Sequence, residues 1–166
     1  MKTIITAVTE IDLQIHIGIT NFLAEYTNVL DEDNLEIWPH FFIENGSYRI
    51  LSLENEKQGL IAPILYLYSQ GMLFDRITAL RDALTYEYLY TRHITSQPLI
   101  QKNADNEFSV KSNFSIFTTT ESGSTKLFVV GQYKDVIIHI DQGFKFKSRD
   151  VILDSFGVPN NISVPL

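Results

Sequence analysis

Two Asp and two Arg side chains crowd the segment "GMLFDRITALRDAL" at residues 71–84. A buried Asp can act as a general acid or base, and an Arg can bind a carboxylate through its planar guanidinium group. The apolar residues recur at helical spacing, which places Asp75 and Asp82 on the polar face and Arg76 and Arg81 at its borders. Carboxylates on a polar face are usually solvated or paired. The spacing therefore favours structural or interface roles over catalysis.

Other catalytic and metal-binding patterns are weak in this sequence. The histidines do not form a local metal-binding motif, although a site assembled only in the folded chain stays open as an alternative. The sequence has neither a G-x-S-x-G turn nor a Gly-rich phosphate-binding loop. It contains no cysteine, which excludes disulfides, Cys-type zinc sites and iron–sulfur clusters, including the Rieske type with mixed Cys and His ligands.

Composition and charge limit the classes of partner and the cellular location that we expect for this chain. The chain has 166 residues and a formal net charge of −7, without a cluster of Lys and Arg. This balance disfavours nucleic acids and anionic membrane surfaces as partners. The longest apolar run is too short to span a bilayer, and the N-terminal residues lack the pattern of a signal peptide. We expect a cytoplasmic protein with a single domain over residues 1–166.

Helical patterns dominate the first half of the chain. The apolar stripe over residues 11–30 predicts an amphipathic helix, with Thr9 and Asp12 at a capping-box spacing before it. Asp33 and Glu36 repeat that spacing and predict a short second helix through "NLEIWPHFF", which Pro39 should kink or end. "GSYRILSL" follows as a first strand, and the segment at 71–84 is the third helix.

The period of the pattern changes to two after residue 90. Four segments show it: "RHITSQPLIQ", "EFSVKSNFSIFTTT", "KLFVVGQYKDVIIHI" and "FKFKSRDVILD". The connections between them are short, and short connections join antiparallel neighbours. The order of helices first and strands second predicts the α+β class, with a curved antiparallel sheet packed on N-terminal helices.

Several of these segments resemble the small (beta) subunit of bacterial aromatic-ring-hydroxylating dioxygenases. The resemblance lies in "FLAEYTNVLDEDNLEIWPHFF" followed by "GSYRI", in "GMLFDRITALR", in "RHITSQPLI" and in "GQYKDVIIHIDQGFKFKSRDVILD". The order and spacing of the four segments carry it, and together they span most of the chain. The residues at family-like positions are our candidates for interface or structural roles: Asp75, Arg76, Arg92, His93, Arg149 and Asp154.

The resemblance implies a cone-shaped fold of the nuclear-transport-factor and polyketide-cyclase type. It also implies a homotrimer of beta subunits docked to catalytic alpha subunits. The Rieske cluster and the mononuclear iron would lie in the alpha partner, so that this chain has no cofactor and no catalytic residue. Its role would be architectural, because electron transfer between alpha subunits depends on a fixed spacing.

A stand-alone enzyme or ligand binder is the alternative. Cyclases and isomerases can use the apolar interior of such a cone together with one carboxylate, His or Tyr. Tyr48, His93 and Tyr133 are the candidates for that role in this sequence. Fold alone does not separate a cyclase from a scaffold subunit.

Overall fold

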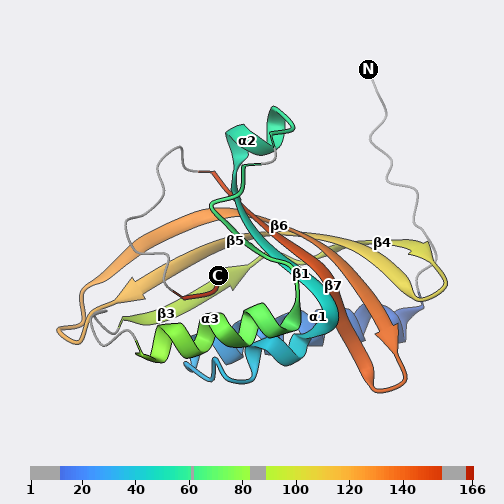
Figure 1. The fold of residues 1–166 in the computed structure, drawn as a ribbon, viewed down its shortest axis with the longest axis horizontal. Helices are drawn as coiled ribbons and strands as arrows, with labels where there is room; N and C mark the ends of the chain where they lie inside the picture. The colour runs from blue at the N-terminus through green and yellow to red at the C-terminus, as the bar shows by residue number, and fades with distance from the viewer. Residues whose placement is uncertain (1–11, 61, 83–88, 155–163) are drawn as a thin grey trace.

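A curved sheet packed over two helices forms the body of the protein. The computed structural model describes residues 12–60, 62–82, 89–154 and 164–166. Helices α1 and α3 lie under the concave side of the sheet, and α2 projects from the opposite side (Figure 1). This arrangement confirms the predicted α+β class. In chain order the elements are α1 Leu13–Asp31, a 3-10 turn Trp38–Phe41, β1 Phe42–Ser52, α2 Leu53–Lys57, β2 Leu65–Leu67, α3 Gln70–Asp82, β3 Tyr90–Thr95, β4 Leu99–Ala104, β5 Glu107–Thr119, β6 Thr125–Ile140 and β7 Gly143–Leu153.

The strands follow the order β2-β1-β7-β6-β5-β3, and β4 also pairs with β5. Short connections make β5, β6 and β7 an antiparallel meander, as the sequence predicts. The segment "RHITSQPLIQ" forms two strands instead of one, since its chain leaves the sheet between Thr95 and Leu99. One pairing differs from the antiparallel sheet that we expected: β1 runs parallel to β7. A parallel pair needs a long crossover, and all the elements from α2 to β6 supply it.

Helix α1 forms where the apolar stripe predicts it. The Asp12 side chain caps the helix by accepting a hydrogen bond of 2.9 Å from the backbone N–H of Gln14. Thr9, the other half of the expected capping pair, lies outside the described residues. The buried face of the helix consists of Ile19, Phe22, Tyr26, Val29 and Leu30. The stripe therefore packs into the core, as its period indicates.

The second helix that we expected after Asp33 does not form. The chain turns at Asp33, whose φ of 57° lies in the left-handed region, and only a 3-10 turn follows at Trp38–Phe41. Pro39 occupies one of the first positions of that turn, where a missing N–H costs no hydrogen bond. The carboxylates of Asp33 and Glu36 bind Arg81 of α3 instead of capping a helix. A tertiary ion pair thus replaces the local cap.

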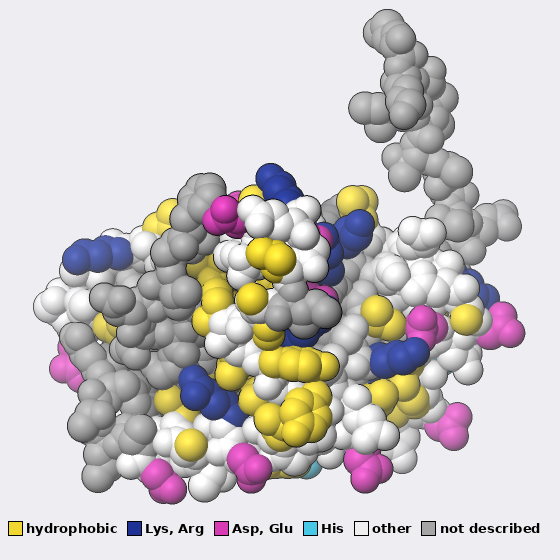
Figure 2. Space-filling model, turned by 45° about the horizontal axis from the view of Figure 1, so that its top comes forward, with side chains coloured by type: hydrophobic (Ala, Val, Ile, Leu, Met, Phe, Trp, Pro, Cys, Tyr) yellow, Lys and Arg dark blue, Asp and Glu magenta, His cyan; other side chains and the backbone are white. Residues whose placement is uncertain are grey.

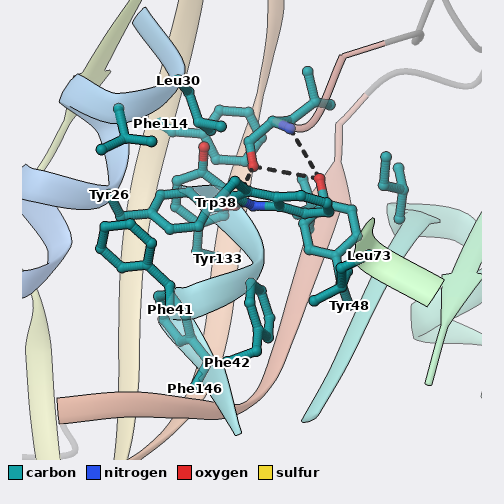
Figure 3. Close-up of a cluster of buried hydrophobic side chains, with 14 of the residues drawn as sticks. Tyr26, Leu30, Trp38, Phe41, Phe42, Tyr48, Leu73, Phe114, Tyr133 and Phe146 are labelled. Carbon is teal, nitrogen blue, oxygen red and sulfur yellow. Dashed lines mark hydrogen bonds between the residues drawn. The ribbon is translucent and has the colours of Figure 1, made fainter. Parts of the chain in front are cut away.

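Hydrogen-bonded aromatic side chains pack in the space between the concave side of the sheet and the helices, which we call the interior of the cone. The indole of Trp38 donates to the Tyr26 hydroxyl at 2.9 Å, and this hydroxyl donates to the carbonyl of Leu166 at 3.2 Å. The N–H of Leu166 donates in turn to the Tyr48 hydroxyl at 2.9 Å (Figure 3). Leu166 is buried, so residues 164–166 form part of the core. Two of these core hydrogen bonds therefore join residues more than a hundred positions apart.

Replacing Tyr48 by Phe should destabilise the protein by about 1–3 kcal/mol, because the buried N–H of Leu166 then has no acceptor. Urea unfolding measures this change. Tyr68→Phe is the matched control, since Tyr68 is 63% exposed. We expect the control to stay within about 0.5 kcal/mol of the wild type. Equal stabilities for the two variants would contradict the assigned hydrogen bond.

Candidate functional site

The interior of the cone holds a buried Arg–Asp pair. Asp135 of β6 and Arg149 of β7 face each other across the antiparallel ladder, and their side chains are 0% and 1% exposed. The guanidinium carbon of Arg149 lies 4.0 Å from the ring centre of Tyr26 and 3.8 Å from that of Tyr133. Both distances are within the range of cation–π contacts. The pair therefore joins α1 to the two central strands.

The hydrogen bonding of this pair is incomplete among the described residues. The Nε atom of Arg149 lies 3.7 Å from Oδ1 of Asp135, which is too long for a hydrogen bond. Nε and Nη1 of Arg149, both carboxylate oxygens of Asp135 and the Tyr133 hydroxyl have no partner there. Burial raises the pKa of Asp135 to about 7, against the opposing effect of the Arg149 charge. Burial also raises the pKa of Tyr133, so its hydroxyl keeps its proton.

A second polar cluster joins the end of α1 to β3. The carboxylate of Asp31 accepts a hydrogen bond of 3.0 Å from the backbone N–H of His93, and its Oδ1 lies 2.6 Å from Nδ1 of the His93 ring. Both side chains are almost fully buried, whereas Arg92 is 67% exposed at 3.7 Å from the same carboxylate. Within the described structure, Nε2 of His93 has no partner. Asp31 thereby fixes the orientation of the His93 ring.

The charges of α3 divide between the fold and the surface. Arg81 binds Glu36 through Nε at 2.8 Å, and it binds the carboxylate and the carbonyl of Asp33 at 2.8 and 2.7 Å. Asp75 is exposed on the opposite face and Arg76 is half-buried, as the helical spacing predicts. Arg81 therefore holds α3 against the segment that follows α1, while Asp75 faces solvent.

The residues that we predicted for the site do not converge on one constellation. Of the interface and structural roles that we expected for Arg149, its burial inside the cone fits the structural one. Arg92 and His93 lie on β3 next to α1, while Asp75 and Arg76 lie on α3. Asp154 is exposed just after β7, where its backbone N–H donates to the carbonyl of Val130. In the described structure, these side chains therefore do not form one catalytic centre.

The three residues of the alternative enzyme hypothesis also have separate partners. Tyr48 bonds to Leu166, His93 to Asp31, and Tyr133 lies against the Arg149 guanidinium. Sequence reasoning missed Asp31 and Asp135. Asp135 had a signal, because it shares one face of its strand with Tyr133 and Ile137, and a carboxylate on an apolar face needs a partner.

An exposed apolar surface lies at the β2 end of the sheet. Ile64, Tyr66 and Tyr68 alternate along β2 and the residues on either side of it, and all three are exposed. We call these three residues the β2 aromatic face. The rings of Tyr66 and Tyr68 lie 5.8 Å apart, and the Arg49 guanidinium lies 5.8 Å from the Tyr66 ring. Hydrophobic side chains run down the middle of this side of the molecule (Figure 2). Surfaces of this kind are typical of protein interfaces.

Across residues 12–60, 62–82, 89–154 and 164–166, no three or more His, Cys, Asp or Glu side chains are grouped so that they could hold a metal ion. No helix in these ranges is long and apolar enough to cross a membrane.

Residues 26–159 match the family model for the ring hydroxylating beta subunit. The chain belongs to this family. The match covers three of the four segments that carry the resemblance in sequence and all but the first four residues of the other, so it confirms the family inferred from them. The protein is accordingly a subunit of an aromatic-ring-hydroxylating dioxygenase, an oxidoreductase complex whose beta subunits act with an alpha partner.

Relatives and solved structures agree with this assignment. The chain is 35% identical over 150 residues to the beta 1 subunit of the terephthalate 1,2-dioxygenase terminal oxygenase component from Comamonas sp.. This alignment covers 90% of this chain and 97% of the relative. The chain is 34% identical over 141 residues to the anthranilate 1,2-dioxygenase small subunit from Burkholderia cepacia, which covers 85% and 88% of the two chains.

A structure from Novosphingobium aromaticivorans, described as a ring-hydroxylating dioxygenase beta subunit, superposes with a TM-score of 0.83. It is 30% identical and covers 91% of this chain and 96% of its own. The beta subunit of benzoate 1,2-dioxygenase from Burkholderia mallei shares the fold at 17% identity, with a TM-score of 0.72 and coverage of 95% and 100%.

The stability of the protein should fall relative to Asp135→Asn as the pH rises from 5 to 8. The folded-state pKa of Asp135, about 7, lies above its ordinary value of 3.8, so the folded chain holds an extra proton between these values. Stability then decreases with rising pH through this window, whereas Asn does not titrate. We expect the difference in unfolding free energy to shift by on the order of 1–3 kcal/mol in favour of the variant.

Urea unfolding at several pH values measures this shift. Asp141→Asn, in the exposed turn between β6 and β7, is the control and should run parallel to the wild type. A difference between Asp135→Asn and the wild type that stays constant over the pH range would contradict the raised pKa.

Proposed function

We propose that this chain is the non-catalytic scaffold subunit of its oxygenase. In this proposal it binds a catalytic alpha subunit and two further copies of itself in the cytoplasm. The family match over residues 26–159 is the observation that carries the proposal. The named functions of the relatives support aromatic acids as the class of substrate, since terephthalate and anthranilate are both aromatic carboxylates.

The side chains of this protein do not fit the redox centres expected of such an oxygenase. A Rieske cluster needs two Cys and two His ligands, and the sequence contains no Cys. A mononuclear non-haem iron site typically uses two His and one carboxylate. The described residues contain no such group of three, because His93 and Asp31 pair with each other without a third ligand. The proposal therefore places both centres on the alpha subunit.

The β2 aromatic face suits the docking of another subunit. β2 is a three-residue strand at the end of the strand order, so one side of it is available in the described structure. Tyr side chains are common anchors at the centre of interfaces, because their rings bury a large area while the hydroxyl keeps a hydrogen bond. The bidentate pair of Arg49 and Asp150, at 2.8 and 2.5 Å, borders this face and adds a polar rim.

Introducing a charge into the β2 aromatic face should weaken the assembly. We expect Tyr68→Glu to lower the yield of complex with the co-expressed alpha subunit by about tenfold or more, because the carboxylate would be buried without a partner. Affinity purification through the alpha subunit, followed by size-exclusion chromatography, measures the yield. Leu99→Glu is the control, because Leu99 is 72% exposed on β4 at the other end of the sheet. A loss with Leu99→Glu alone would contradict this docking surface.

The iron of the assembled oxygenase should follow the alpha subunit. After the subunits are separated in mild denaturant, metal analysis and the visible absorption of the Rieske cluster should assign the iron and the labile sulfide to the alpha fraction. The beta fraction should refold without iron to the same far-UV circular dichroism as the chain expressed alone. Stoichiometric iron in the beta fraction would contradict the proposed scaffold role.

A further inference from the structure

Residues 164–166 lie inside the cone without belonging to the sheet. Leu166 is 1% exposed and is part of the buried core, and Pro165 before it is buried as well. None of the three residues is part of a strand, so the segment adds no ladder hydrogen bonds to the sheet. Among the described residues, hydrogen bonds reach the segment only through the side chains of Tyr26 and Tyr48. The segment is therefore held as a ligand is held, by the side chains around it.

Two phenol groups bind the backbone of Leu166. Its N–H donates to the Tyr48 hydroxyl at 2.9 Å, and its carbonyl accepts a hydrogen bond from the Tyr26 hydroxyl at 3.2 Å. Burial raises the pKa of Tyr26 to about 12 and the pKa of Tyr48 well above its ordinary value, so both hydroxyls keep their protons. Pro165 has no N–H that would need an acceptor inside the core. The site thus binds both backbone polar groups of one residue while it encloses an apolar side chain.

The walls of this site are held by contacts that do not involve the segment. The indole of Trp38 donates to the Tyr26 hydroxyl at 2.9 Å, and its ring packs edge-on against Tyr48 with 5.2 Å between the ring centres. The Tyr26 ring also lies against the Arg149 guanidinium, and Tyr48 belongs to β1, which is paired with β2 and β7. Rings fixed in this way keep their positions when the segment leaves, so the site is preformed.

We propose that the interior of the cone is a binding site for a short apolar peptide, and that Val164–Leu166 is its ligand in this chain. The segment leaves and re-enters the site without unfolding of the sheet. The class of ligand follows from the contacts: a leucine side chain is buried in the core, and Tyr48 and Tyr26 bind its N–H and its carbonyl. The site is independent of the proposed scaffold role and of any redox centre.

Hydrogen exchange in the unmodified chain tests whether the segment opens separately. We expect the amide of Leu166 to exchange at least about tenfold faster than the slowest amides of the central strand β6, because opening of the segment requires no unfolding of the sheet. Two-dimensional amide NMR after transfer to deuterated water measures both rates. Exchange of the Leu166 amide at the rate of the β6 core would overturn the proposal, because the segment would then open only with the whole fold.

Leu166→Asp tests the site itself, and the buried Trp38 is the reporter because it is the only Trp of the chain. A carboxylate is costly to bury at this apolar position, so the segment should leave the site. We expect the fluorescence of Trp38 to shift to longer wavelength and its quenching by acrylamide to rise, while the far-UV circular dichroism stays like that of the wild type. Leu99→Asp, at a residue that is 72% exposed, is the matched control and should leave the Trp38 emission unchanged. An unfolded Leu166→Asp protein, or an unchanged Trp38 emission in it, would contradict a separable segment.

The emptied site should then accept the peptide as a separate molecule. Acetyl-Val-Pro-Leu should bind the Leu166→Asp protein with a Kd on the order of 1 mM or tighter, and it should reverse the change in Trp38 emission. Acetyl-Val-Pro-Asp is the matched control peptide, and we expect its affinity to be at least about tenfold lower, because it has no leucine side chain for the core. The wild type should bind acetyl-Val-Pro-Leu more weakly than the variant does, because its own segment competes. Equal binding of the two peptides, or no binding of acetyl-Val-Pro-Leu, would refute the peptide site and leave the scaffold role untouched.

Discussion

The guanidinium of Arg149 is the constraint on which the position of α1 over the sheet depends. It is held between rings from α1 and β6, while its strand neighbour Asp135 supplies the opposite charge. An Arg side chain keeps its proton inside a protein, so this charge must be matched wherever the chain places it. Removing one partner of a buried pair leaves the other uncompensated, which is costly. The contacts of Arg149 therefore favour one position of α1 over the sheet.

The acidic segment at the end of α1, residues 31–36, forms the next set of connections between elements. Asp31 binds the start of β3 through His93, whereas Asp33 and Glu36 bind α3 through Arg81. One short stretch thus joins three elements that are far apart in the chain. Many of the charged groups near the core bind within the subunit, whereas the side chains of the β2 aromatic face are exposed.

The local sequence pattern was sufficient to predict most of the helices and strands, but it did not predict which side chains and strands they contact. The apolar periods of α1, α3 and β5 predicted which faces are buried, and the buried set Phe108, Val110, Phe114 and Ile116 confirms this for β5. The capping pair at Asp33 misled, because the same carboxylates serve Arg81, which is 48 residues away from Asp33. The parallel pairing of β1 with β7 has no local signal. Family resemblance placed Arg149 and His93 at important positions, but it did not show that Asp135 and Asp31 bind them.

The pairing of β1 with β7 also sets the order of events in synthesis. Arg49 and Asp150 are 101 residues apart, so β1 lacks this neighbour until most of the chain has left the ribosome. At ordinary translation speeds this wait is roughly 5–20 s. Until then β1 lacks the backbone hydrogen-bond partners that β7 supplies from Ser47 to Ser52.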